Sequence, residues 1–111
     1  MKKFMLILFE DGAVYQDFSP EEMQKEIEIH MKWIEELGTH YVDGDPLNAE
    51  ARTVTGNEKV VTDGPYIESK ELVSGYYILK AADMNQATEL AKGCPVLRLG
   101  GTAEVREIME Y

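Results

Sequence analysis

A carboxylate at the end of a predicted strand is the first residue in this sequence that could do chemistry. Asp63 follows an apolar, β-branched stretch and is followed directly by Gly64 and Pro65. Such a carboxylate can act as a general base, or orient a histidine, when burial or a neighbouring charge tunes it. An Asp in a turn commonly accepts the backbone N–H two residues on, but residue 65 is Pro and has none. A functional Asp63 and a turn-stabilising Asp63 therefore have about equal weight.

A run of polar residues follows Asp63 in the same connection between strands: Glu68, Ser69, Lys70 and Glu71. Connections held by rigid strands often carry binding groups, so Ser69 and Lys70 are candidate ligand contacts, together with Tyr66. Lys70 would suit an anionic group. A solvated loop is the simpler interpretation of a charged run.

His30 is the second candidate for acid–base chemistry. It fills a slot in the apolar stripe of a predicted helix, one turn from both Ile27 and Ile34. A helix buries such a stripe against its sheet, so the imidazole should be partly covered and could pair with Asp63 near neutral pH. The alternative is a core histidine bonded to a backbone carbonyl. Trp33 could line the same pocket, although core packing is the simpler interpretation.

The elements that must position these groups begin with a strand and a helix. The continuous apolar run at 4–9 predicts a central strand. Ser19 is a suitable N-cap, Pro20 fits the first helical position, and Glu22 completes a capping box. Gly38 should end this helix.

The rest of the chain predicts a strand-rich middle and a second helix before a final strand. We expect an extended stretch and turn at 40–47, with the break at Gly44-Asp45-Pro46, and hairpin strands at 51–55 and 59–62. A long strand at 72–80, a helix at 83–93 and a strand at 102–109 should follow. The order β-α-β-β-β-α-β predicts an α+β, ferredoxin-like antiparallel sheet with two helices on one face. Because nothing in the chain remains to cover the other face, we predict a homodimer.

Composition narrows the partners of this single predicted domain, residues 1–111. The formal net charge is −10, which argues against nucleic acid and anionic membrane surfaces as partners. The apolar run near the N-terminus is too short for a signal peptide or a membrane span, so we expect a cytoplasmic protein. The single cysteine, Cys94, is expected to be a small buried hydrophobe.

The sequence carries no pattern that calls for a metal or a cofactor. The two histidines are ten residues apart, and the carboxylates are scattered without ligand spacing. No phosphate-binding loop, dinucleotide turn or serine elbow is present. We therefore predict that no metal and no redox cofactor is needed.

Several motifs resemble the DGPF-type branch of the YCII-related proteins. The central match runs from Val61-Thr62-Asp63-Gly64-Pro65-Tyr66 through Glu68-Ser69-Lys70-Glu71 to Gly75-Tyr76-Tyr77. Further matches are Met5-Leu6-Ile7, Ser19-Pro20-Glu21-Glu22, Ala82-Asp83, Cys94-Pro95 and Glu104-Val105-Arg106. The family usually has Phe where this chain has Tyr66, which adds a hydroxyl group.

The resemblance implies a dimeric α+β barrel and a site on the first helix. YCII-type relatives pair a helix histidine with an Asp as a suggested active site; that position falls near Ile27, and His30 is one turn further on. The hypothesis is that the protein binds a small organic molecule. If the protein is an enzyme, Asp63 and His30 would be the acid/base groups that transform this molecule. The alternative is a non-catalytic ligand-binding or regulatory module linked to transcription regulation. The sequence leaves open whether the protein is an enzyme.

Overall fold

The computed structural model describes residues 1–64 and 71–111. The predicted ligand contacts Tyr66, Ser69 and Lys70 lie outside the described residues. The strands are β1 (Lys2–Asp11), β2 (Tyr41–Pro46), β3 (Arg52–Thr55), β4 (Val60–Asp63), β5 (Glu71–Ala81) and β6 (Thr102–Glu107). The helices are α1 (Pro20–Leu37) and α2 (Met84–Ala91), with short 3₁₀ helices η1 (Gly12–Tyr15), η2 (Gly38–His40) and η3 (Pro95–Leu99).

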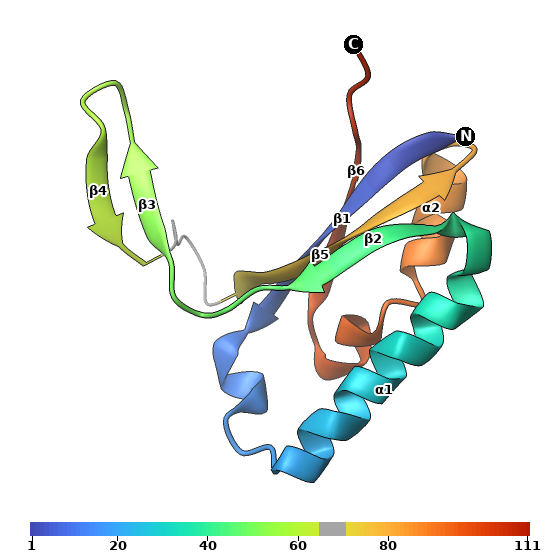
Figure 1. Cartoon of the computed structure of the whole chain (residues 1–111), viewed down its shortest axis with the longest axis horizontal. Coiled ribbons are helices and arrows are strands. Elements are labelled where there is room, and N and C mark those ends of the chain that lie inside the picture. Colours follow the sequence, from blue (N-terminus) through green and yellow to red (C-terminus); the bar gives the residue numbers. More distant parts are fainter. Residues whose placement is uncertain (65–70) are drawn as a thin grey trace.

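The main sheet has the strand order β2-β5-β1-β6, and every neighbouring pair is antiparallel. Both α-helices lie on one side of this sheet (Figure 1). The predicted α+β, ferredoxin-like class is therefore confirmed. Neither α1 nor α2, the α-helices of the described part, is long and apolar enough to cross a membrane.

Two parts of the predicted strand arrangement are corrected. The break expected at Gly44-Asp45-Pro46 does not occur, because these residues continue β2, which forms an edge of the main sheet beside β5. The hairpin strands β3 and β4 pair only with each other in a separate two-stranded sheet that projects from the body of the molecule (Figure 1). All four residues of β4 are exposed, including Val60 at 53% and Val61 at 59%, so the hairpin is not packed against the main sheet.

Helix α1 begins as the sequence predicts. The Ser19 side chain accepts the backbone N–H of Glu22 at 3.1 Å, and the Glu22 carboxylate accepts the backbone N–H of Ser19 at 3.2 Å. This reciprocal capping box satisfies two donors that a helix start otherwise leaves open. Gly38, with φ of 57°, follows the last helical residue.

The buried face of α1 is rotated from the predicted stripe. Its buried residues are Glu26, Trp33 and Leu37, whereas Ile27 is 48% exposed. His30 lies between them at helical spacing and is partly buried. The helix thus turns a carboxylate and an imidazole, together with Trp33, towards the sheet.

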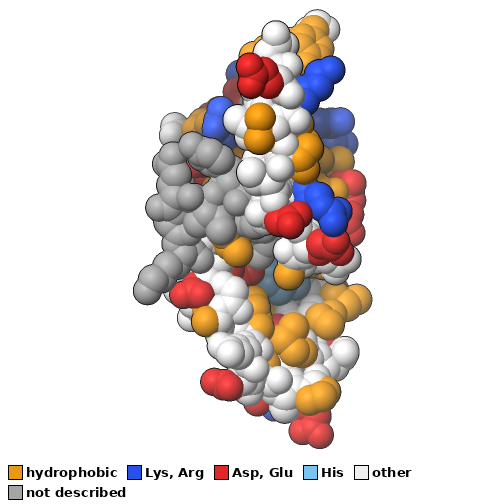
Figure 2. Space-filling model, turned by 90° about the vertical axis from the view of Figure 1, so that its left-hand side faces the viewer, with side chains coloured by type: hydrophobic (Ala, Val, Ile, Leu, Met, Phe, Trp, Pro, Cys, Tyr) orange, Lys and Arg blue, Asp and Glu red, His pale blue; other side chains and the backbone are white. Residues whose placement is uncertain are grey.

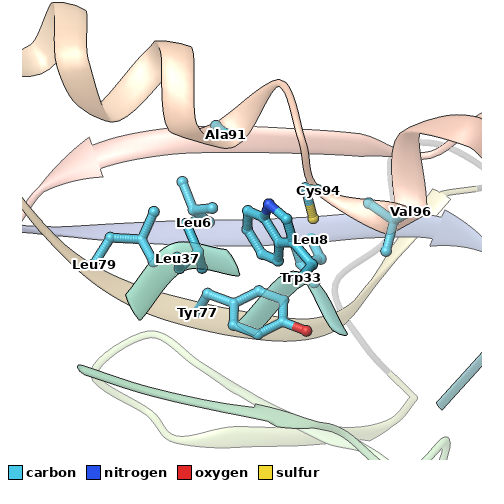
Figure 3. Packing of buried hydrophobic residues seen from close by; sticks show 9 residues of the cluster. All are labelled: Leu6, Leu8, Trp33, Leu37, Tyr77, Leu79, Ala91, Cys94 and Val96. Atoms are coloured by element: carbon cyan, nitrogen blue, oxygen red, sulfur yellow. The ribbon is translucent and has the colours of Figure 1, made fainter. Parts of the chain in front are cut away.

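The side of β1 that faces the helices alternates apolar residues and ends in a carboxylate. Phe4, Leu6 and Leu8 are 0%, 0% and 4% exposed, and the next position in this alternation is Glu10, at 7%. Leu6 and Leu8 belong to the main core cluster, drawn in Figure 3. Polar groups therefore begin where the apolar core ends.

Tyr77 of β5 belongs to the same core cluster and lies at its boundary. Its ring meets Trp33 edge to face, with ring centroids 5.0 Å apart. Its hydroxyl points away from Leu79, towards the edge of the cluster (Figure 3). On the other side Gly44 of β2 leaves room for the ring, because a Cβ at residue 44 would lie 2.5 Å from Cδ1 of Tyr77.

Replacing Gly44 by alanine should therefore destabilise the fold by about 1–3 kcal/mol, since the added methyl group must displace Tyr77 or the backbone. The measurement is the free energy of unfolding in urea. Gly12→Ala is the matched control because a Cβ at Gly12 meets nothing within 4 Å, and it should change stability by less than about 0.5 kcal/mol. Equal stability of the two variants would contradict the packing described for Tyr77.

Candidate functional site

A cavity of about 920 Å³ opens where the apolar core ends. It lies between α1, η1 and the adjoining ends of β1, β2 and β5, and the segment 46–51 forms a further wall. Figure 2 shows hydrophobic side chains around a recessed histidine, with acidic side chains on the same face. The volume is within the range of small-molecule sites.

His30 is held at the cavity by a hydrogen bond to the core. Its Nδ1 lies 2.6 Å from the hydroxyl oxygen of Tyr77, and the two rings are nearly parallel with centroids 6.0 Å apart. Nε2 has no hydrogen-bond partner among the described residues, and His30 lines the cavity. One ring nitrogen thus faces the fold and the other remains available to a ligand.

Burial keeps the His30 ring neutral. Desolvation lowers the pKa of His30 below its ordinary value, and the charge of Arg98 acts in the same direction. The nearby carboxylates of Glu10 and Glu26 oppose this shift without reversing it. A neutral imidazole can donate a hydrogen bond at one nitrogen while accepting at the other.

A buried carboxylate network forms a second part of the site. Glu10 accepts hydrogen bonds from the Tyr15 hydroxyl and, at 2.7 Å, from the Ser74 hydroxyl. Ser74 is the extra residue of a bulge, because Leu8 pairs with Gly75 and the next residue of β1 pairs with Val73. Burial, followed by the bond to Glu10, raises the pKa of Tyr15, so its phenol remains a donor.

A second buried carboxylate, Glu26, reaches the same cavity from α1. Its Oε1 forms an ion pair with Arg98 of η3, while its Oε2 is buried without a hydrogen-bond partner in the described part of the chain. An unsatisfied buried carboxylate oxygen is costly, which favours a donor arriving from a ligand or water.

The wall of the cavity is strongly acidic. Within residues 1–64 and 71–111 no Lys or Arg lines it. The acidic residues that line it are Glu10, Asp11, Glu26, Asp45, Glu50 and Glu71. The remaining lining is mainly apolar, with residues such as Ile27, Met31 and Ile34. A negative wall repels anions and accepts cations or uncharged donors.

The structure locates the predicted site residues in three different environments. His30 lies in the cavity. The Asp63 side chain is 95% exposed at the end of β4 and lies 3.4 Å from Arg52, and it is not among the cavity-lining residues. Trp33 is 7% exposed inside the core. His30 and Asp63 are thus not brought together by the described contacts of one chain.

Glu10 and Glu26 are site residues that the sequence prediction missed. Glu10 lies just beyond the strand predicted at 4–9, and it continues the alternation of Leu6 and Leu8 at a core-facing position. Glu26 precedes His30 by one helical turn, and a carboxylate in a buried stripe is a recognisable signal. Both signals become visible once the correct buried face is known.

Other reactive groups do not form a site in the described residues. Cys94 is 3% exposed, and burial raises the pKa of its thiol to about 11, so it agrees with the predicted buried hydrophobe. No three His, Cys, Asp or Glu side chains of residues 1–64 and 71–111 gather closely enough to hold a metal ion.

Fold and cavity together define a small α+β protein with an acidic, histidine-containing pocket. The chain belongs to the YCII-related domain family, whose model matches residues 1–111. An uncharacterised protein of Rhizobium meliloti (strain 1021) is 25% identical over 119 residues, which cover 97% of this chain and 93% of that protein.

One solved structure shares the fold over the whole chain. It is 5-chloro-2-hydroxyhydroquinone dehydrochlorinase (TftG) from Burkholderia phenoliruptrix AC1100, in complex with 2,5-dihydroxybenzoquinone. The match has a TM-score of 0.55 and 13% sequence identity, and covers 100% of this chain and 96% of the dehydrochlorinase. At this identity the likeness establishes the fold.

The lowered pKa of His30 predicts a specific pH dependence of stability. As the pH falls through the ordinary value of 6.5, the unfolded chain takes up a proton that the folded chain does not. The wild type should therefore lose stability relative to His30→Gln below that pH, and the difference should be constant above it. Urea unfolding at about pH 7.5 and about pH 5.5 measures this. A smaller loss in the wild type would mean that burial does not lower this pKa.

Proposed function

We propose that the protein binds a small organic molecule, uncharged or cationic, in the cavity beside His30. The observation that carries the proposal is the joint presence of a neutral histidine and two buried carboxylates, Glu10 and Glu26, on the wall of one cavity. Core residues rarely include buried carboxylates without a reason, because their desolvation costs stability. The quinone complex of the dehydrochlorinase is consistent with a small organic ligand in this fold.

The charge of the wall argues for the ligand class. Six carboxylates and no described Lys or Arg line the cavity, so an anionic ligand would meet repulsion from nearly every side. Apolar residues such as Ile27, Met31 and Ile34 would cover the body of the ligand. A hydroxyl, amine or ammonium group could donate to Glu26 Oε2.

Acid–base chemistry is the proposed enzymatic use of the site. His30 is neutral and has one ring nitrogen open to the cavity. With the hydrogen on this nitrogen it can polarise an acceptor oxygen of a bound molecule, and in the other tautomer it can accept a proton from the molecule. Glu10, already bonded to Tyr15 and Ser74, is a fixed negative charge near the same space. These groups need no redox cofactor for a proton transfer.

Asp63 keeps its predicted acid/base role only as a separate proposal. Its exposed carboxylate pairs with Arg52, and within one chain it is not part of the cavity wall. Asp63→Asn would leave turnover unchanged if only the cavity groups act, and would reduce it if the hairpin reaches a site.

The matches at Asp63-Gly64-Pro65 also lead us to assign the chain to the DGPF branch of the family.

Three probes with the same ring and different charge test the ligand class. We expect acetophenone and benzylammonium to shift backbone amide resonances around the cavity, and benzoate to shift them far less. Glu10→Gln removes one wall charge while retaining the shape of the side chain, so it should narrow the gap between benzoate and the other probes. Two-dimensional NMR of the wild type and the variant is the measurement. Stronger binding of benzoate than of both other probes would refute the proposal.

Glu107→Gln serves as the matched control for the loss of one charge. Glu107 lies on β6 and forms an ion pair with Lys2, outside the cavity wall. It should leave the ranking of the three probes unchanged. An equal effect of both variants would mean that net charge, not the cavity, governs binding.

A non-catalytic ligand-binding or regulatory module remains the alternative form of this proposal. A ligand that raises the melting temperature without product formation supports it, whereas product formation that His30→Gln abolishes supports the enzyme.

We also propose that two copies associate through the face of the main sheet opposite the helices. On β1 this face carries Met5, Ile7 and Phe9, and on β5 it carries Tyr76 and Ile78. The paired residues of the edge strands are charged, with Glu104 and Arg106 on β6 and Asp43 and Asp45 on β2. Both helices cover the other face (Figure 1). Phe9 and Tyr76 also line the cavity, so a second copy on this face would help to close it.

The wild type should accordingly have twice the 12.6 kDa mass of one chain in solution, and Ile7→Lys should shift it towards the monomer. Sedimentation velocity measures both, and circular dichroism checks that the variant is folded. Val54→Lys, on the exposed hairpin, is the control and should leave the mass unchanged. A wild type that stays monomeric at high concentration would refute the association.

A further inference from the structure

We propose that Tyr77 is a positioning residue that holds His30 in the tautomer with its hydrogen on Nε2. The cavity then presents an N–H donor at this point, and a ligand would meet it with an acceptor oxygen. The tautomer assignment stands on its own contacts, whereas its use by a ligand rests on the proposed function.

The argument starts from the donors and acceptors that the Tyr77 hydroxyl can reach. Tyr77 is 6% exposed, and the described residues offer its hydroxyl one hydrogen-bond partner, Nδ1 of His30. If Nδ1 carried the hydrogen, the buried phenol O–H would have no acceptor among the described residues. If the phenol donates to Nδ1, both groups are satisfied and the ring hydrogen must be on Nε2.

The surroundings of His30 favour the same arrangement. Burial raises the pKa of Tyr77, so the phenol keeps its hydrogen and acts as donor. The charged groups that act on His30 from the elements around it are Glu10 of β1, Glu26 of α1 and Arg98 of η3. Their opposing effects, with burial, leave the ring neutral and therefore in one of two tautomers.

The position of Tyr77 is fixed by packing and not by the hydrogen bond alone. Trp33 meets the ring edge to face, and Gly44 admits it against β2. The hydroxyl is thus held at the core boundary, so the donor reaches Nδ1 without the loss of freedom that an exposed side chain would suffer.

The chain contains an internal reference for this assignment. Its second histidine, His40, also uses Nδ1, but the partner is the backbone carbonyl oxygen of Lys80 at 2.8 Å. A carbonyl oxygen only accepts, so Nδ1 of neutral His40 must carry the hydrogen. The two histidines should therefore be opposite tautomers in the same folded protein.

Long-range ¹H–¹⁵N correlation of the imidazole rings in the unliganded wild type tests the proposal. We expect a pyridine-type Nδ1 and a pyrrole-type Nε2 for His30, and the reverse for His40. A pyrrole-type Nδ1 on His30 would overturn the proposal. Because no ligand is present, this result does not depend on the proposed function.

Tyr77→Phe separates positioning from packing, since it keeps the ring and removes the donor. In this variant His30 should become a mixture of tautomers and its pKa should rise, because the bond to the neutral ring is lost. Tyr76→Phe, the neighbouring residue on the other face of β5, should change neither. An unchanged His30 tautomer in Tyr77→Phe would also overturn the proposal.

A titration with acetophenone tests separately whether the cavity binds a ligand and whether Tyr77 sets the tautomer of His30. The carbonyl oxygen of the probe should shift the Nε2–H resonance of His30 in the wild type. A correct tautomer with no such shift would count against the proposed cavity function and leave the role of Tyr77 intact.

Discussion

The packing of Tyr77 is the contact on which the rest of the site depends. Its ring closes the core against Trp33, while its hydroxyl reaches His30 at the core boundary. Gly44 makes this position available, since any larger residue on β2 would occupy the space of the ring. One side chain thereby connects the apolar interior to the polar wall of the cavity, and the orientation of the imidazole follows from how the sheet is packed.

The two buried carboxylates show the same dependence on the fold. Glu10 stands at the end of an otherwise apolar alternation on β1, and Glu26 stands on the buried face of α1. A charged carboxylate at either buried position would destabilise the fold unless polar partners bonded to it. Tyr15, Ser74 and Arg98 supply them from η1, a bulge in β5 and η3, which are far apart in the sequence. The acidic wall is therefore built by the tertiary structure from separate segments.

The sequence predicted the local elements well where short-range chemistry specifies them. The capping box at Ser19 and Glu22 defined the start of α1, and Asp83 caps α2 by accepting the backbone N–H of Gln86 at 2.8 Å. The sequence predicted less well which face of α1 would be buried against the sheet. Of the predicted stripe, Ile34 packs against the core cluster, whereas Ile27 is 48% exposed and the helix buries Glu26 and Trp33 instead. Side-chain spacing alone does not say which face of a helix meets the sheet.

By itself the sequence determined the α+β class, the family, the acidic charge and His30 as a candidate group, since these follow from patterns within a few residues or from composition. Only the tertiary structure decided the partner of His30. The sequence offered Asp63 or a backbone carbonyl as its partner. The Asp63 carboxylate lies beside Arg52 on a separate hairpin, and the partner in the structure is the hydroxyl of Tyr77, 47 residues away in the sequence. Pairing between distant segments depends on strand register and packing, which no local pattern encodes.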